Sequence, residues 1–237
     1  MLPNYSPATL HSIQIGAPTH YGFEDAVDPH DKPWTTGFFK TPVEGPIYVG
    51  TTNLAGDGQA DLVNHGGVDK AVLAYSANHY PHWREELRMP ALPLGGFGEN
   101  LTIAGLCEAA VCIGDNFRIG DVRFEISQPR QPCWKLARRW RMHELTGLVV
   151  RNGRSGWYFR VLDQGWIEAG MQVTLIERPN PEWTVARANV ILHHCRTDVS
   201  SMLELASVPR LADSWVNELR ERAESLRTPG TIRPQAP

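Results

Sequence analysis

One cysteine in this chain lies in a setting that favours a reactive thiolate. Cys133 follows Pro132 in the segment QPRQPCWKLARR. Four cationic side chains lie within six residues of it: Arg130, Lys135, Arg138 and Arg139. A helix that starts at Pro132 would also place the thiol at its positive end, and both effects favour thiolate. A thiolate can attack an electrophile, carry a sulfane sulfur or bind a soft metal, whereas a buried structural cysteine is the alternative.

The other three cysteines, Cys107, Cys112 and Cys195, lack this cationic setting. Cys107 and Cys112 lie in an apolar stretch, which is typical of packing residues. The chain has no CxxC pair, so we expect free thiols in a reducing compartment. A zinc site at the adjacent residues 193–195 is an alternative. Neighbouring residues on a helix point in different directions, so a surface or core cluster is the simpler interpretation.

A second segment, DLVNHGGVDKA, places two glycines between polar side chains. Gly66 and Gly67 allow the backbone to approach a ligand or adopt a positive φ, and exposed N–H groups in such a turn can hold an anion. His65 and Lys70 flank the turn and could donate charge-assisted hydrogen bonds to a phosphate. An ordinary hairpin turn is the alternative. Lys70 could also form a Schiff base with PLP, but no other PLP signature accompanies it.

Two further segments, GGFGENL and GRSGWYFR, combine glycine with polar or aromatic residues. Glu99 could donate a proton, and Asn100 could bind a polar ligand edge. Arg154 and Arg160 could hold a phosphate, and Trp157 could stack on a flat heterocycle. The alternatives are an ordinary glycine-rich turn for the first segment and a strand with one buried aromatic face for the second.

Short apolar segments separated by glycine and proline must position these residues. The clearest strand covers 122–127, where apolar and polar side chains alternate, and 171–175 alternates likewise. Weaker strand candidates are 12–15, 47–49, 71–75 and 156–162. Many short strands with such connections predict a mainly β, barrel-like fold with a few short helices. Helices are expected at 78–87, with Pro81 in the first turn, and at 133–141 after Pro132.

The chain changes character after Pro181 and predicts a small domain of three helices. Thr184, Asp198 and Asp213 are expected to cap these helices. Trp215, Leu219 and Ala223 recur at four-residue spacing and should line one buried face. The expected division is a barrel domain over 1–180, the helices over 181–228 and a disordered tail over 229–237.

Composition excludes several classes of protein. The 237 residues are 42% hydrophobic, which suffices for one full core and a small second domain. The formal net charge of −3 lacks the basic footprint of nucleic-acid or membrane-surface binding. The N-terminus does not read as a secretory signal, and no run of about 18 apolar residues occurs. We therefore expect a cytoplasmic protein without nucleic-acid or membrane partners.

The segments together are more specific than any one alone. The order HGGxDKA, GENL, GD, QPRxPC and GWYFRV resembles the MOSC domain, named for the C-terminal part of molybdenum cofactor sulfurase. With the helical C-terminus, residues 10–226 resemble the YiiM type of bacterial MOSC protein. The resemblance implies a barrel-like domain in which Cys133 ligates the molybdenum of a pterin cofactor, or carries sulfur as in sulfurase relatives.

The resemblance also implies reduction of N-hydroxylated bases such as 6-N-hydroxylaminopurine, a detoxification. The residues expected to act in catalysis are Cys133, His65, Asp69 and Glu99, with Tyr75 as a further proton relay. The residues expected to hold the cofactor are His65, Gly66, Gly67, Lys70, Glu99, Asn100, Arg130, Cys133, Arg154, Trp157 and Arg160. No GxGxxG or flavin fingerprint is present, so electrons are expected from a separate reductase.

Two alternatives remain open on the sequence. Cys133 could carry a persulfide in a sulfur-transfer protein, with the sulfur supplied by a partner because the chain has no room for a PLP-dependent desulfurase domain. The chain could instead bind or deliver the molybdenum cofactor without turnover. The sequence fixes neither the physiological substrate nor the electron donor, and a homodimer through the helical tail is possible.

Overall fold

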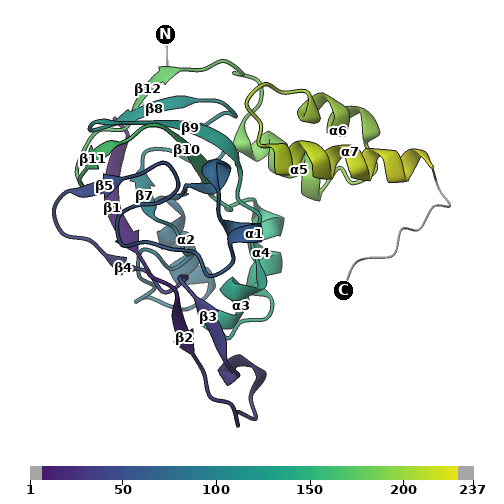
Figure 1. Ribbon diagram of the computed structural model, residues 1–237. Helices are drawn as coiled ribbons and strands as arrows, with labels where there is room; N and C mark the ends of the chain where they lie inside the picture. The colour runs from purple at the N-terminus through teal and green to yellow at the C-terminus, as the bar shows by residue number, and fades with distance from the viewer. Residues whose placement is uncertain (1–6, 229–237) are drawn as a thin grey trace.

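The computed structural model describes residues 7–228, and Figure 1 shows a curled sheet with three helices projecting from one side. The expected disordered tail, 229–237, lies outside the described residues. The main sheet has the order β12-β8-β9-β10-β6-β7-β1-β4. Its strands are β1 (Thr9–Ile15), β4 (Thr41–Pro42), β6 (Val72–Ser76), β7 (Leu101–Ala104), β8 (Asn116–Ile119), β9 (Val122–Pro129), β10 (Trp157–Asp163) and β12 (Thr174–Glu177).

Hydrogen bonds between β1 and the chain just before β12 curl this sheet toward a barrel. The Leu10 N–H donates to the Met171 carbonyl at 2.8 Å, and the Val173 N–H donates to the Ala8 carbonyl at 2.8 Å. All neighbouring strands run antiparallel except β6 and β7. The predicted mainly β, barrel-like fold is confirmed. The strand predicted at 171–175 starts later, at Thr174, because the preceding residues bond to the start of β1 instead.

Two small sheets stand outside the main one. β5 (Ile47–Val49) pairs with β11 (Gly165–Ile167), and β2 (Thr19–Tyr21) pairs with β3 (Trp34–Thr36). The β2–β3 hairpin, with the short η1 helix (Pro29–Asp31) in its connection, reaches away from the body in Figure 1. The sequence analysis expected β5 but not the other three strands.

Alternation along β10 decides which side chains enter the barrel core. Trp157, Phe159 and Val161 are buried in the main apolar cluster, while Tyr158 and Arg160 point to the opposite face. A second apolar cluster lies under α2 (His79–Glu86) and α4 (Leu145–Asn152). Its largest members are Trp83, Tyr75, Tyr80 and Phe97.

The helices of the barrel domain are short. Pro81 falls in the first turn of α2, as predicted. α3 (Trp134–Trp140) starts one residue later than expected, so Cys133 is its N-cap, and it ends at Arg141 in a left-handed conformation. Four elements were not predicted: η1, α1 (Leu62–His65), η2 (Val68–Lys70) and α4. The side chain of Asp61 caps α1 by accepting from the Val63 N–H at 3.1 Å.

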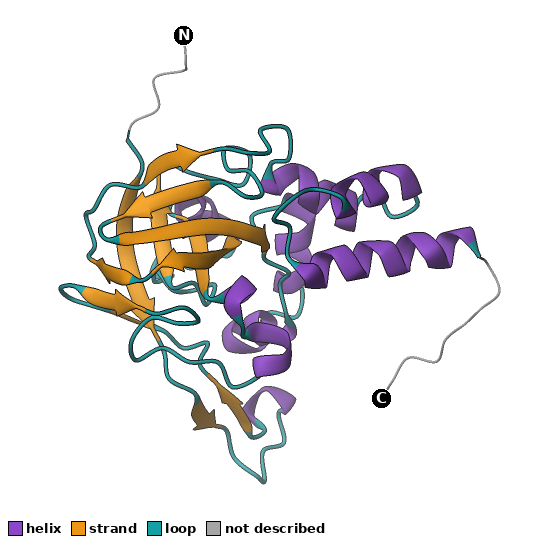
Figure 2. Ribbon diagram, turned by 45° about the horizontal axis from the view of Figure 1, so that its top comes forward, coloured by secondary structure: helices purple, strands orange, loops and turns teal. Residues whose placement is uncertain are grey.

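The C-terminal residues form the expected three helices, shown as the group beside the sheet in Figure 2. They are α5 (Val185–His193), α6 (Val199–Ala206) and α7 (Asp213–Arg227). Thr184 and Asp198 cap α5 and α6 with their side chains, whereas Asp213 is the first residue of α7 and Ala212 is its N-cap. The residues predicted at four-residue spacing on α7 are all buried. No helix in residues 7–228 is long and apolar enough to cross a membrane.

Candidate functional site

Cys133 lies where two pocket compartments meet. We name them the inner and the outer compartment, and they share His65, Lys70, Cys133 and Tyr158. The inner compartment encloses about 590 Å³, part of it open to solvent, and its polar lining includes Lys40, Gln59, Asn100, Arg130 and Lys135. The outer compartment encloses about 740 Å³ counted the same way, and is further lined by Asp61, Asn64, Gln128, Gln131, Pro132 and Trp134.

The backbone around Cys133 is fixed at the junction between β9 and α3. The Arg130 N–H donates to the Gly156 carbonyl at 3.0 Å, just after β9 ends. The Cys133 carbonyl accepts from the Leu136 N–H at 3.1 Å and from the Thr146 hydroxyl at 3.3 Å. The thiol is free and half-buried. A rigid backbone therefore presents an unpaired sulfur to both compartments.

Arg130 brings a buried positive charge to the inner compartment. The residue is only 3% exposed, and its Nη2 donates to the Phe97 carbonyl at 3.1 Å. Its Nη1 is also buried and has no hydrogen-bond partner within the described residues. A buried donor without an acceptor is costly, and an anionic ligand in the inner compartment would satisfy it. Arg130 therefore fits a site for a phosphate or a similar anion.

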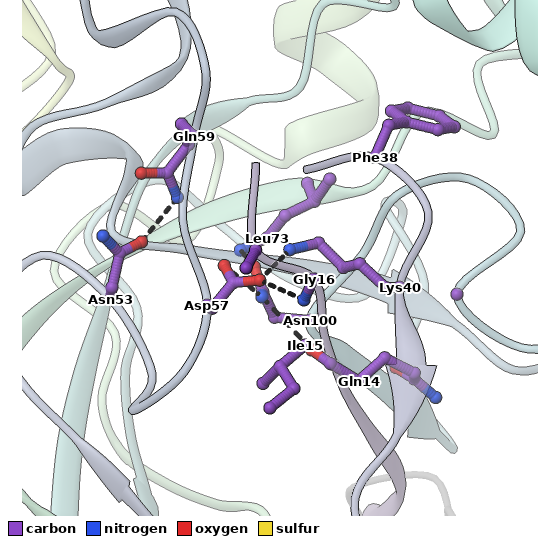
Figure 3. A network of polar contacts seen from close by, with 12 residues as sticks. Gln14, Ile15, Gly16, Phe38, Lys40, Asn53, Asp57, Gln59, Leu73 and Asn100 are labelled. Carbon is purple, nitrogen blue, oxygen red and sulfur yellow. Dashed lines mark hydrogen bonds and ion pairs between the residues drawn. The ribbon is translucent and has the colours of Figure 1, made fainter. Parts of the chain in front are cut away.

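Asn100 and Lys40 form a polar network at the inner compartment, shown in Figure 3. The Asn100 Nδ2 donates to Asp57 Oδ2 at 2.9 Å, and the Gly16 N–H donates to Asp57 Oδ1 at 2.8 Å. Lys40 forms an ion pair with the same carboxylate, and both side chains are almost fully buried. Burial lowers the pKa of Lys40, opposed by the Asp57 charge.

The shared wall contains two groups that can hold a proton. Burial, then the nearby Lys135 charge, lowers the pKa of His65 to about 4, so its imidazole is neutral at pH 7. Burial raises the pKa of Tyr158 to about 12, so its hydroxyl keeps its proton. Lys70 donates from Nζ to the Asn64 carbonyl at 2.8 Å, and burial lowers its pKa.

Glu99 does not line either compartment. Its carboxylate is fully buried and accepts from the Gly95 N–H at 2.8 Å and from the Phe97 N–H at 3.1 Å. These bonds hold the glycine-rich loop, in which Gly98 has a φ of +82° and a Cβ would approach the Phe38 ring to 2.6 Å. The loop thus brings its backbone, rather than the Glu99 side chain, to the inner compartment.

Other predicted site residues lie in structural contacts away from the pocket. Arg160 donates from Nε to Asp69 at 2.6 Å and also pairs with Glu125, and neither Arg160 nor Asp69 lines the two compartments. Arg154 pairs with Glu86 at 2.8 Å. Trp157 is fully buried in the barrel core.

Further members of the predicted set are likewise held elsewhere. The Tyr75 hydroxyl is buried and donates to the Arg154 carbonyl at 2.9 Å. Gly66 and Gly67 connect α1 to η2 without lining either compartment, and Gly67 has a φ of +94°. Of the four cations near Cys133 in sequence, Arg138 and Arg139 donate to carbonyls such as His30 and Phe38 instead.

Several pocket residues were missed by the sequence analysis: Lys40, Gln59, Gln131, Trp134 and Tyr158. Tyr158 could have been found, since alternation along the strand places it opposite the buried Trp157. Trp134 and Gln131 lie inside the segment already singled out around Cys133. For Lys40 no local signal exists, because its partner Asp57 lies 17 residues away.

Within residues 7–228, no group of three or more His, Cys, Asp and Glu side chains is placed to hold a metal ion, the cluster at 193–195 included. A soft, sulfur-rich metal site at Cys133 would instead be completed by sulfur atoms of a cofactor. The free thiol and the unpaired Arg130 donor are what fit such a group.

Comparison with known proteins identifies two regions of the chain. Residues 61–174 match the family model described as "MOSC domain". Residues 183–226 match the family model described as "YiiM-like, 3-alpha helix domain". Together the two matches span the pocket residues from Asp61 onward and the three C-terminal helices.

Individual relatives agree with these matches. "Uncharacterized protein YflK" of Bacillus subtilis is 40% identical over 91% of this chain and 94% of its own length. A Gibberella moniliformis protein named "Reductase" is 35% identical over 81% of this chain, but the match spans only 34% of that protein. The crystal structure of YiiM from Geobacillus stearothermophilus superposes with a TM-score of 0.76 at 35% identity, over 92% of this chain and all of that one.

Proposed function

This chain belongs to the family of YiiM-like MOSC-domain proteins, and we propose that it is a reductase of N-hydroxylated bases that binds a molybdenum cofactor through Cys133. The observation that carries the proposal is the free thiol of Cys133 beside a buried, unpaired Arg130 donor. A relative named "Reductase" supports the reaction type. The substrate, a compound such as 6-N-hydroxylaminopurine, rests on family resemblance.

The inner compartment suits the cofactor. A pterin dithiolene surrounds molybdenum with soft sulfur ligands, and a protein thiolate is a matching further ligand. Arg130 and Lys135 offer charge to the pterin phosphate, and the Asn100 and Gln59 amides offer hydrogen bonds to the ring. When bound, the cofactor supplies the two-electron oxygen-removal chemistry, and the protein positions it.

The proposed reaction converts R–NHOH, two electrons and two protons into R–NH₂ and water. The N–O bond breaks, nitrogen is reduced, and the oxygen leaves as water. Two electrons come from a separate reductase. His65 and Tyr158 are the groups at the shared wall that can pass protons, because both are uncharged there at neutral pH. A neutral imidazole can relay a proton without leaving a charge in a pocket that is already cationic.

Turnover with a chemical electron donor tests the proposal. The purified protein should convert 6-N-hydroxylaminopurine to adenine in the presence of dithionite-reduced methyl viologen, at one base per two electrons. Cys133→Ala should abolish turnover above the uncatalysed rate. Cys195→Ala is the matched control, because that thiol is also free and half-buried but lines neither compartment.

Two other results would favour the alternatives. Stoichiometric molybdenum without turnover of any N-hydroxylated base indicates a cofactor-binding module. A mass increment of about 32 Da on Cys133 corresponds to one added sulfur atom, as in a persulfide. This increment in a protein without molybdenum indicates a sulfur carrier. We propose that the protein acts in the cytoplasm beside a separate reductase and that its three C-terminal helices offer the surface for a homodimer.

A further inference from the structure

The two compartments have different chemistry. The inner compartment is lined by cationic side chains, among them Lys40, Arg130 and Lys135. The outer compartment combines the amides of Asn64, Gln128 and Gln131 with the Trp134 ring, and its charged members are Asp61 and the shared Lys70. Cations suit an anionic ligand, whereas amides and an indole face suit a flat, uncharged heterocycle with hydrogen-bonding edges.

We propose that the outer compartment is the substrate site, in which Trp134 stacks on the heterocycle and Gln131, positioned by α7 of the three-helix domain, binds its edge. The inference rests on the proposed function, because it supposes that Cys133 marks the reacting centre. It adds a division of the pocket between cofactor and substrate, and it gives the three-helix domain a role in substrate selection.

Trp134 is a supported but largely free aromatic surface. Its side chain is 55% exposed although it lines the outer compartment. The Trp34 ring lies 5.6 Å away between centroids, and the Arg138 guanidinium carbon lies 5.6 Å from the Trp134 ring centroid. These contacts hold the indole from the hairpin side. Because Trp134 directly follows Cys133, a base stacked on it would lie close to the thiol.

Gln131 is fixed by a relay of hydrogen bonds from the three-helix domain. Its Nε2 donates to Glu218 Oε2 at 2.7 Å. Glu218 Oε1 accepts from Arg222 at 3.1 Å, and Arg222 also donates to the Leu192 carbonyl at 2.6 Å. An ionised carboxylate only accepts, so the NH₂ group of Gln131 must face Glu218. The Oε1 of Gln131 is therefore the atom left to bind a ligand.

A second contact from α7 supports the same wall. The Ser214 hydroxyl donates to Gln128 Oε1 at 3.0 Å, one turn before Glu218 on the helix. Gln128 is buried and lines the outer compartment. The first half of α7 thus contacts two of the three amides. For Gln128 it adds to a barrel contact, in which Nε2 donates to the Pro129 carbonyl at 3.4 Å.

This orientation predicts a preference among purines. An acceptor at Gln131 selects a base whose edge donates a hydrogen bond, as an amino or hydroxylamino group does. In the wild type, 9-methyladenine should bind about tenfold tighter than 6-methoxy-9-methylpurine, because the methoxy compound has acceptors but no donor at that edge. A factor of about ten in affinity corresponds to one good hydrogen bond. Calorimetric titration of each base measures both affinities without turnover.

Glu218→Gln tests the positioning role directly. In the variant, Arg222 still donates to the oxygen of the side chain at position 218. The NH₂ group of that new amide therefore faces Gln131 and donates to the Gln131 Oε1. The Gln131 amide must then turn and present NH₂ to the ligand. We expect the preference for 9-methyladenine to fall to about threefold or less, or to reverse. An unchanged preference in a Glu218→Gln protein with wild-type circular dichroism would overturn the role of Gln131.

Trp134 is tested with a matched pair of tryptophans. Trp134→Leu should weaken 9-methyladenine binding about tenfold or more, and Trp134→Phe should restore most of it, as expected for loss and return of stacking. Trp166→Leu should have no effect, because Trp166 is 52% exposed but lies on β11 against Tyr48. Equal affinities in Trp134→Leu and Trp166→Leu, or no binding by the wild type at millimolar base, would overturn the substrate site.

Molybdenum content of the same samples separates this inference from the proposed function. Trp134→Leu should keep the metal of the wild type while losing base affinity, since the cofactor is assigned to the other compartment. Loss of metal and base together would overturn the division of the pocket. Base binding that depends on Trp134 in a protein without molybdenum or turnover would sink the proposed function and leave the base site standing.

Discussion

The residues around Cys133 carry more positive than negative charge, and this imbalance adds to the effect of burial on His65. Burial, then the charges of Lys135, Arg130 and Lys70, lowers the pKa of His65, whereas Asp61 raises it. The same cations favour an anion in the inner compartment. A thiolate at Cys133 would neutralise part of this positive charge, and a bound phosphate would neutralise more of it.

His65 should therefore titrate far below a free histidine. With a folded-state pKa of about 4, it stays neutral from pH 7 down to about pH 5. The unfolded chain takes up that proton near pH 6.5, so the contribution of His65 to stability is lost progressively as the pH falls from 6.5 toward 4. NMR titration of the imidazole, assigned with His65→Gln, measures the midpoint. A midpoint above pH 6 would contradict the desolvated, cationic environment.

The buried pair of Lys40 and Asp57 should be costly to break. Asp57→Asn leaves the buried ammonium without its counter-charge, and such losses amount to about 3–5 kcal/mol of unfolding free energy. The loss of unfolding free energy in Asp57→Asn should shrink as the pH rises. Burial already lowers the pKa of Lys40, so the unpaired ammonium can lose its proton at high pH. Urea unfolding at pH 7 and pH 9 measures both effects. The double variant Lys40→Met/Asp57→Asn is the control. It removes both charges but keeps an amide oxygen for the Gly16 and Asn100 donors, so it should cost less than Asp57→Asn at pH 7.

At the scale of elements, α3 holds both the site loop and the β2–β3 hairpin. Cys133 caps its start, and Arg138 in its second turn reaches the hairpin connection. The Arg138 guanidinium carbon lies 4.6 Å from the centroid of the Trp34 ring on β3. Arg141 at the end of α3 pairs with Asp28 at 3.0 Å. The hairpin leads into Phe38 and Lys40 of the inner compartment, so these contacts align two parts of the pocket.

Arg138→Ala should loosen the hairpin without unfolding the barrel. Amides of residues 19–36 should exchange with deuterium faster, because the stacked guanidinium and its bond to the His30 carbonyl are both lost. Amides of β9 and β10 should be unaffected. Hydrogen-exchange mass spectrometry reads both regions at once. Arg220→Ala, at an exposed arginine of α7, is the control. Uniform acceleration over the whole chain would refute the local role of Arg138.

Local patterns predicted the elements better than they predicted the pocket. Three patterns of residues close together in the sequence predicted their elements. They are the alternation of polar and apolar residues in β9, the capping residues of α5 and α6, and the four-residue spacing on α7. The pocket brings together distant segments, so Lys40 carried no signal of its own. Arg160 and Trp157 were predicted as ligand-binding residues, but a tertiary ion pair occupies one and the barrel core encloses the other.

At the scale of the whole molecule, the three-helix domain is continuous with the barrel beside the site. The Ala212 N–H donates to the Ser127 carbonyl of β9 at 2.9 Å, just before α7 begins. Arg210, before that helix, pairs with Glu125 of β9, whose carboxylate also binds Arg160 of β10. Since β9 leads directly to Arg130 and Cys133, the same strand anchors the helices and delivers the site residues.

Molybdenum analysis tests the central claim most directly. Wild-type protein, Cys133→Ala and Cys195→Ala should be purified from the same cofactor-producing host and analysed by inductively coupled plasma mass spectrometry. Ligation by Cys133 predicts close to one molybdenum per chain in the wild type and in Cys195→Ala, with most of the metal lost from Cys133→Ala despite an unchanged circular dichroism spectrum. Full molybdenum occupancy in Cys133→Ala would contradict the assignment of Cys133 as the metal ligand.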